Sequence, residues 1–141
     1  MKKLILGLFL VMGAGLASYA QCEKRVLIVS SVTEHLKGGE VERTKDETST
    51  IEFDAKEIII SPGDDPSITG TIKSTTCEWK TPFKEGKSVV KAVVTDPRGQ
   101  TFNITVTVEG KEGKISFLLE IEEQPDRKIR LLVDKFEEKK S

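Results

Sequence analysis

Residues 101–108 read Thr-Phe-Asn-Ile-Thr-Val-Thr-Val, and this stretch decides the fold class. Apolar and polar side chains alternate without a break, the apolar members being Phe102, Ile104, Val106 and Val108. Because successive side chains of a β-strand point to opposite faces, this alternation predicts a strand with one buried face. We expect Ile104 and Val106 to be buried and Thr105 and Thr107 to face solvent.

The same pattern continues on both sides of this strand. Further strands are predicted at 88–95, 115–121 and 129–133. The short segments between them, at 96–99, 109–113 and 124–126, contain the proline, glycine and aspartate residues that favour turns. Strands joined by short turns pair antiparallel with their neighbours. The C-terminal half is therefore predicted to be a meander.

The N-terminal half is less regular but also predicts strands, at 26–32, 51–53, 57–60 and 68–79. In the last of these, Cys77 and Trp79 fall on the opposite parity to Ile68 and Ile72, which indicates a bulge or bend near 74–76. The charged, glycine-containing segment 35–46 is predicted to be a loop or a loose hairpin. Residues 41–44 within it are a candidate ninth strand.

Eight antiparallel strands in meander order predict an all-β protein that closes into an up-and-down barrel. The interior of such a barrel is either filled by side chains or holds one small ligand. An immunoglobulin-like β-sandwich is the alternative fold. In that fold the tryptophan follows the first cysteine and a tyrosine stands two residues before the second. Here Trp79 follows the second cysteine, and Thr75 takes the tyrosine position.

Residues 1–20 have the order of a secretory signal peptide. Lys2 and Lys3 precede an apolar run from Leu4 to Leu16, and small residues stand one and three positions before a cut after Ala20. The run is shorter than the roughly 20 residues of a membrane span. We expect residues 21–141 to form a single domain that is periplasmic or secreted and does not span a membrane. An uncleaved anchor and a lipid anchor on Cys22 are the alternatives, although Gln21 is larger than the residue that usually precedes a lipidated cysteine.

Cys22 and Cys77 are the two cysteines of the chain. In an oxidising compartment they favour a disulfide, whereas a metal site would need further ligands at close spacing. Two free thiols are the alternative.

The remaining residues point away from catalysis. His35 is the single histidine and lies in the segment predicted to be a loop, so neither a serine triad nor a zinc site can be assembled around it. Asp64 and Asp65 lack the ligand spacing of a calcium loop. We therefore expect no enzyme activity, no metal and no cofactor. After loss of Lys2 and Lys3, 20 basic residues face 23 acidic ones, a balance that does not favour nucleic-acid binding.

Four phenylalanines lie on the apolar parity of different strands and are predicted to converge inside: Phe53, Phe102, Phe117 and Phe136. Inward aromatic side chains pack a core by default, and they can also line the cavity of a small ligand. Both interpretations are open from the sequence.

In size, export, strand number and hairpin connectivity, nearly the whole of residues 21–141 resembles the lipocalin-like, or calycin, barrels. These often carry Gly-x-Trp in the first strand, where this chain has Val26-Leu27-Ile28-Val29. The resemblance implies a carrier or sequestering protein for a small apolar ligand. The alternative is an envelope module with a filled core that binds or inhibits another protein.

Overall fold

The computed structural model describes Cys22 and residues 24–139. The predicted signal peptide, its cleavage junction and Gln21 lie outside these residues. The eight strands are β1 (Val26–Lys37), β2 (Glu40–Phe53), β3 (Glu57–Pro62), β4 (Ile68–Thr81), β5 (Glu85–Thr95), β6 (Thr101–Lys111), β7 (Lys114–Ile121) and β8 (Gln124–Glu138).

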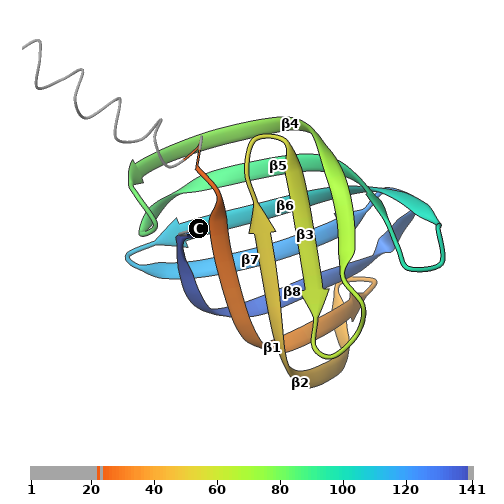
Figure 1. Cartoon of the computed structure of the whole chain (residues 1–141). Coiled ribbons are helices and arrows are strands. Elements are labelled where there is room, and N and C mark those ends of the chain that lie inside the picture. Colours follow the sequence, from red (N-terminus) through yellow and green to blue (C-terminus); the bar gives the residue numbers. More distant parts are fainter. Residues whose placement is uncertain (1–21, 23, 140–141) are drawn as a thin grey trace, which may run out of the picture.

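The strands follow one another around a closed barrel in chain order (Figure 1). Every neighbouring pair is antiparallel, and β8 returns to pair with β1 along its length, from Val26 opposite Glu138 to Lys37 opposite Arg127. The predicted all-β up-and-down barrel is confirmed. The sandwich alternative is wrong, because one continuous ladder runs through all eight strands instead of two separate sheets.

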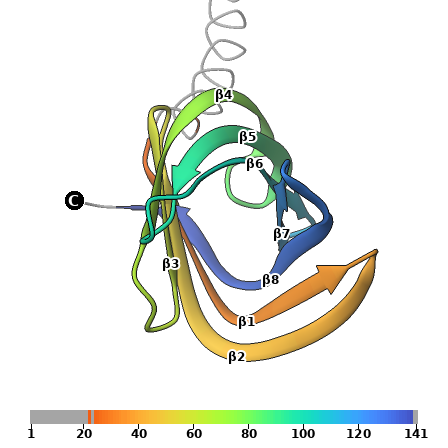
Figure 2. The same ribbon diagram turned by 90° about the vertical axis from the view of Figure 1, so that its right-hand side faces the viewer.

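Of the two predictions for the segment 35–46, the hairpin is confirmed and the loop is wrong. The segment is the far part of a long hairpin, in which β1 and β2 turn at Gly38 and Gly39, and residues 41–44 belong to β2 and do not form a ninth strand. Both glycines have positive φ, 61° and 85°, which suits a two-residue turn between antiparallel strands. Figure 2 shows β1 and β2 curving together around one side of the barrel.

The interior follows the alternation of the sequence. Ile104, Val106 and Val108 are buried, whereas Thr105 and Thr107 lie on the outer face and are half-buried. The irregularity predicted near 74–76 lies just before that position, as a register shift between Ile72 and Ser74 in the ladder of β4 and β5. It brings Cys77 and Trp79 to the inner face.

One end of the barrel is closed by Trp79, which is 3% exposed. Its register partners on β5 and β6 are Gly86 and then Gly110. A Cβ on Gly86 would lie 2.7 Å from the indole, and one on Gly110 would lie 2.9 Å from it. The two glycines therefore leave the space that the indole fills. The indole Nε1 donates a hydrogen bond of 2.7 Å to Ser88 Oγ, so its polar atom is satisfied inside the core.

The disulfide lies at the same closed end. Cys22, which precedes β1, is bonded to Cys77 of β4, so the predicted pairing is confirmed. Beside it Phe136 of β8 packs against Trp79, with ring centroids 5.4 Å apart, and against Phe83, at 4.9 Å. The N-terminal residues of the domain are thus fixed to the barrel by a covalent bond next to its aromatic plug.

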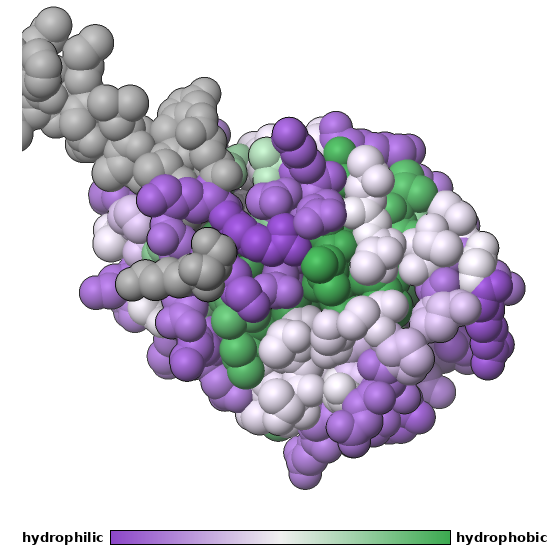
Figure 3. Space-filling model, viewed as in Figure 1, coloured by the Kyte–Doolittle hydropathy of each residue, from purple (hydrophilic) through white to green (hydrophobic). Residues whose placement is uncertain are grey.

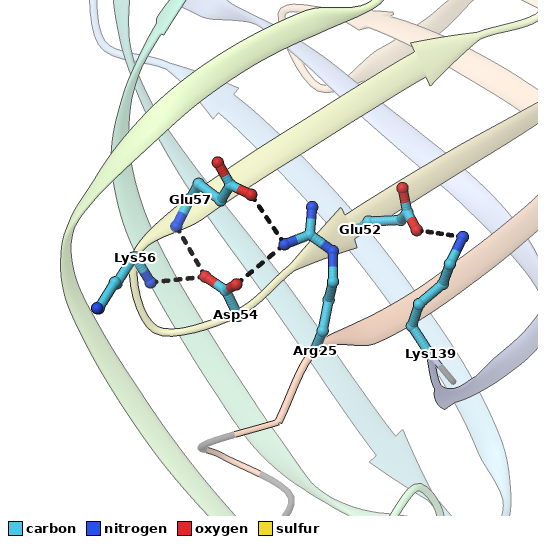
Figure 4. Close-up of polar contacts among 6 residues, drawn as sticks. All are labelled: Arg25, Glu52, Asp54, Lys56, Glu57 and Lys139. Atoms are coloured by element: carbon cyan, nitrogen blue, oxygen red, sulfur yellow. Dashed lines mark hydrogen bonds and ion pairs between the residues drawn. The ribbon is translucent and has the colours of Figure 1, made fainter. Parts of the chain in front are cut away.

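Ion pairs on the outer surface fix the start and end of the domain (Figure 4). The Arg25 guanidinium contacts Asp54 at 2.9 Å and Glu57 at 3.0 Å, and Lys139 contacts Glu52 at 2.6 Å. Asp54 also accepts the backbone N–H groups of Lys56 and Glu57. Burial acts to raise the pKa of Asp54, but these hydrogen bonds and Arg25 outweigh it and lower the pKa. The β2–β3 turn is therefore held by a charged carboxylate.

The alternation on β6 predicts unequal losses of stability from two adjacent truncations. Ile104→Ala should lower the free energy of unfolding by about 2–5 kcal/mol, because it removes a buried aliphatic side chain. Thr105→Ala should lower it by less than about 1 kcal/mol, as changes on an outer face usually do. Urea denaturation of both variants measures the difference. Equal losses would contradict the assignment of inner and outer faces.

Reduction of the disulfide should destabilise the domain. The bond joins residues 55 positions apart, and closing a loop of that length stabilises a fold by about 4 kcal/mol in the chain-entropy model. Denaturation with and without reductant gives the loss directly. The Cys22→Ser/Cys77→Ser double variant should be equally destabilised and insensitive to reductant. If reductant leaves the denaturation midpoint of the wild-type protein unchanged, the disulfide does not stabilise the domain and the prediction is wrong.

Candidate functional site

The end of the barrel opposite Trp79 is hollow. It holds a cavity of about 360 Å³, whereas the void beside the disulfide at the closed end measures about 10 Å³. The apolar wall of the cavity comes from seven of the eight strands. Its members are Ile51, Ile60, Ile68, Val94, Phe102, Ile104, Phe117, Leu119, Ile121, Ile129 and Leu131.

Two residues that carry hydroxyl groups interrupt this apolar wall. Thr33 on β1 and Ser49 on β2 line the cavity and are only 4% and 3% exposed. Neither Thr33 Oγ1 nor Ser49 Oγ forms a hydrogen bond with any of the described residues. Leaving a buried hydroxyl unpaired costs about 1–3 kcal/mol, so each of these two groups is an unfavourable feature of the empty barrel.

The mouth of the cavity carries charge on the face of β2 that continues from Ser49. Arg43, Lys45 and Glu47 occupy alternate positions and line the opening. Lys45 forms an ion pair of 3.3 Å with Glu47. Across the mouth, Asp96 accepts hydrogen bonds from backbone N–H groups of its own turn, and Asp65 completes the rim.

Arg43 differs from Lys45, the other cation of the rim, which is paired with Glu47. No carboxylate of the residues that the structure describes lies within ion-pair distance of its guanidinium. Its polar neighbour is His35, whose Nε2 lies 3.4 Å from Arg43 Nη2. The rim of the cavity therefore carries one cation, Arg43, that has no carboxylate partner among the described residues.

His35 is held in its neutral form. Burial lowers the pKa of His35 below its ordinary value, and the positive charges of Arg43 and Lys45 lower it further. Glu47 and Glu42 oppose this effect without reversing it. At neutral pH the imidazole therefore adds a polar but uncharged group to the mouth.

The four phenylalanines do not meet at one place. Phe102 and Phe117 line the large cavity. Phe53 and Phe136 border the small void at the closed end, next to Cys77. Two of the four phenylalanines thus pack the closed end, and the other two border the cavity at the opposite end.

Sequence reasoning did not identify Thr33, Arg43 or Ser49. One signal was present. Alternate residues of β2 change from charged (Arg43, Lys45, Glu47) to hydroxyl (Ser49) and then to apolar (Ile51). Read with the period of a strand, this gradient places a polar mouth above an apolar interior.

The outer surface over β1 to β3 is mixed in character (Figure 3). Apolar groups are visible between hydrophilic ones, and the ladder places Glu52 directly between Leu27 and Ile59. Because Glu52 is paired with Lys139, a charged contact divides this apolar surface. The hollow end of the barrel is therefore the stronger candidate site.

Comparisons of the chain with protein-family models, with curated proteins and with solved structures found no match. Within Cys22 and residues 24–139, no three His, Cys, Asp or Glu side chains gather where a metal ion could be held. The same part of the chain contains no helix of the length and apolar character needed to cross a membrane.

The environment of His35 predicts its titration. Its ring proton resonances are identified without assignment, since the chain has a single histidine, and they should report a pKa below the ordinary value of about 6.5. Arg43→Gln should raise this pKa, whereas Lys87→Gln, on the exposed face of β5 next to Gly86, should leave it unchanged. Protein carrying no histidine tag is required for the NMR titration.

The lowered pKa of His35 also determines the direction in which this residue changes the stability of the fold as the pH falls. Around pH 6 the folded chain binds fewer protons at His35 than the unfolded chain does, so this group destabilises the fold as the pH falls through the ordinary histidine range. A pKa at or above about 6.5 would contradict the expected dominance of burial and of Arg43 over the neighbouring carboxylates.

Proposed function

We propose that this protein is an exported, non-catalytic binding protein that holds a small apolar ligand inside its barrel. The observation that carries the proposal is the cavity of about 360 Å³, which lies within the range of ligand sites, about 300–1,000 Å³. Its wall is mainly aliphatic and aromatic, and its few polar groups are gathered on β1 and β2. This combination is typical of pockets that bury the body of a ligand and orient one end of it.

The architecture supports a lipocalin-like protein. Eight strands in up-and-down order enclose an interior that is closed at one end by Trp79 and open at the other. An envelope module that binds or inhibits a protein through its surface is the alternative function. Such a module would need no cavity.

Export to the periplasm or to the exterior is supported by two features. Residues 1–20 have the pattern of a signal peptide, and the Cys22–Cys77 disulfide is typical of an oxidising compartment. The disulfide also argues against a lipid anchor on Cys22. A lipid would be attached through the sulfur atom that is already bonded to Cys77.

Binding inside the barrel is tested by a matched pair of substitutions on β7. Leu119 lines the cavity, while its neighbour Leu118 points outward and is half-buried. Leu119→Trp should fill part of the cavity and weaken binding of the neutral fluorescent probe N-phenyl-1-naphthylamine by about tenfold. The larger side chain takes the space of about two methylene groups of the probe, and losing their burial costs about 1.6 kcal/mol, a factor of slightly more than ten in affinity.

Leu118→Trp is the control and should bind the probe as the wild type does. The measurement is a fluorescence titration, with circular dichroism to verify that both variants fold. If the wild type does not bind the probe, or if both variants bind equally well, a ligand site inside the barrel is refuted.

A further inference from the structure

The last part of β8 is paired on one side only. β7 pairs with β8 no further than Ser116 opposite Leu132, whereas β1 continues to pair with β8 as far as Glu138. Figure 1 shows this last part of β8 bending toward the start of β1. Among the described residues, the edge of β8 that faces away from β1 therefore has no strand beside it from Val133 to Glu138. We call this the free edge of β8.

The hydrogen bonds to β1 show which peptide groups the free edge presents. The backbone N–H of Lys139 donates a hydrogen bond of 2.8 Å to the carbonyl oxygen of Arg25. In an antiparallel ladder, hydrogen-bonded pairs alternate with pairs that are not bonded to each other. The peptide groups of Lys135 and Glu137 therefore point toward β1, and those of Phe136 point toward the free edge.

A groove of about 520 Å³ lies along the free edge. Its apolar lining includes Phe83, Ile115, Leu132 and Phe136, and Leu132 is 49% exposed. The rings of Phe83 and Phe136 are 4.9 Å apart, and Phe83 has a φ of 61°, which is uncommon for a bulky residue. An unpaired strand edge beside exposed apolar side chains is a template for pairing with another chain.

The charges of the free edge are complementary to each other. Lys135 and Glu137 flank Phe136, are exposed, and form no ion pair within the described part of the chain. If two copies pair antiparallel about Phe136, Lys135 of each copy lies opposite Glu137 of the other. These opposite residues are not hydrogen-bonded to each other, so their Cα atoms are only about 4.5 Å apart and their side chains are close.

We propose that the free edge of β8 docks a second copy of this chain, with the two β8 strands antiparallel about Phe136 and Lys135 of each copy paired with Glu137 of the other. The exchanged peptide groups of the two Phe136 residues join the strands, and the groove leaves room for the second strand. Because Phe136 packs against Trp79, this interface lies at the closed end of the barrel and does not cover the mouth of the cavity.

Acidic residues limit the length of the shared ladder. One position further out, Asp134 of one copy lies opposite Glu138 of the other. Lys24 contacts Glu138 at 3.2 Å and compensates its charge, and Asp134 has no partner in the ladder of β1 and β8, where the register shifts. The pairing is therefore centred on residues 135–137.

A second unpaired edge, at residues 40–48 of β2, is less suited to a second copy. β3 pairs with β2 only from Ser49 onward. An antiparallel pairing about Thr44, the middle residue of this edge, places Arg43 of one copy opposite Lys45 of the other. Like charges directly opposite each other destabilise a ladder, and charged edges of this kind resist pairing.

The test is sedimentation velocity of the exported, disulfide-bonded protein over a wide range of concentrations, which should show a reversible equilibrium of monomer and dimer. Glu137→Lys and Lys135→Glu each place two like-charge pairs across the interface and should weaken dimerisation about tenfold or more. The double variant Lys135→Glu/Glu137→Lys exchanges the two charges and should dimerise as the wild type does. Lys91→Glu, on the exposed outer face of β5, is the matched control and should have no effect.

Amide hydrogen exchange gives a second readout that does not depend on the charged side chains. The amide of Phe136 points toward the free edge and should exchange more slowly in concentrated protein than in dilute protein. The amide of Glu137 points toward β1 and should be equally protected at both concentrations.

The outcomes separate this pairing from other uses of the same edge. A protein that remains monomeric at every concentration overturns the proposal and leaves the free edge to an extended segment of a different protein. A dimer that neither single variant weakens, or that the double variant does not restore, overturns the pairing of the two β8 strands. Exchange of the Phe136 amide that does not change with concentration overturns it as well.

Discussion

The contact between the Trp79 indole and the paired glycines Gly86 and Gly110 determines which end of the barrel is solid. An eight-stranded barrel encloses a limited interior, and one large ring fills much of its cross-section. The indole is satisfied by Ser88, packed against Phe136 and flanked by the disulfide. A side chain on either glycine would collide with the ring or the nearby backbone, so the closed end depends on two residues with no side chain.

The hollow end follows from the same arrangement. Beyond the plug, the inner faces of the strands carry mainly aliphatic side chains, which line the interior around the cavity without filling it. The long β1–β2 hairpin adds the polar wall, because its inner face continues past the apolar residues to Ser49 and then to Arg43. The aromatic plug and the cavity thus lie at opposite ends of one barrel, so the proposed ligand site does not involve the plug.

Where apolar and polar residues alternate, as they do from Thr101 to Val108, the sequence predicts well the order of the strands. It also predicts which side chains lie on the inner and outer faces of the barrel. It predicts the β1–β2 hairpin poorly because residues 40–46 are all exposed and carry no apolar alternation. Their strand conformation depends on pairing with β1 across the Gly38–Gly39 turn. That pairing is a tertiary effect, which overrides the weak local preference of a charged segment.

Dependence on tertiary structure also explains which features of the candidate site the sequence did not predict. Parity predicted that the four phenylalanines point inward, but it carries no information about height along the barrel. Height depends on the register of all eight strands, and it separates Phe53 and Phe136 from Phe102 and Phe117. Thr33 and Ser49 become significant only when the cavity beside them is known, since an unpaired hydroxyl is a property of three-dimensional surroundings.

The central claim is that one end of the barrel is packed and the other is hollow, and methyl-resolved NMR spectra recorded with and without dissolved xenon test it most directly. Xenon occupies apolar cavities and shifts the methyl resonances that line them. The account predicts shifts for Ile104, Leu119 and Ile129, and none for Val26 or Val108. Spectra in which no methyl group responds, or in which Val26 and Val108 respond as strongly as Leu119, would contradict it.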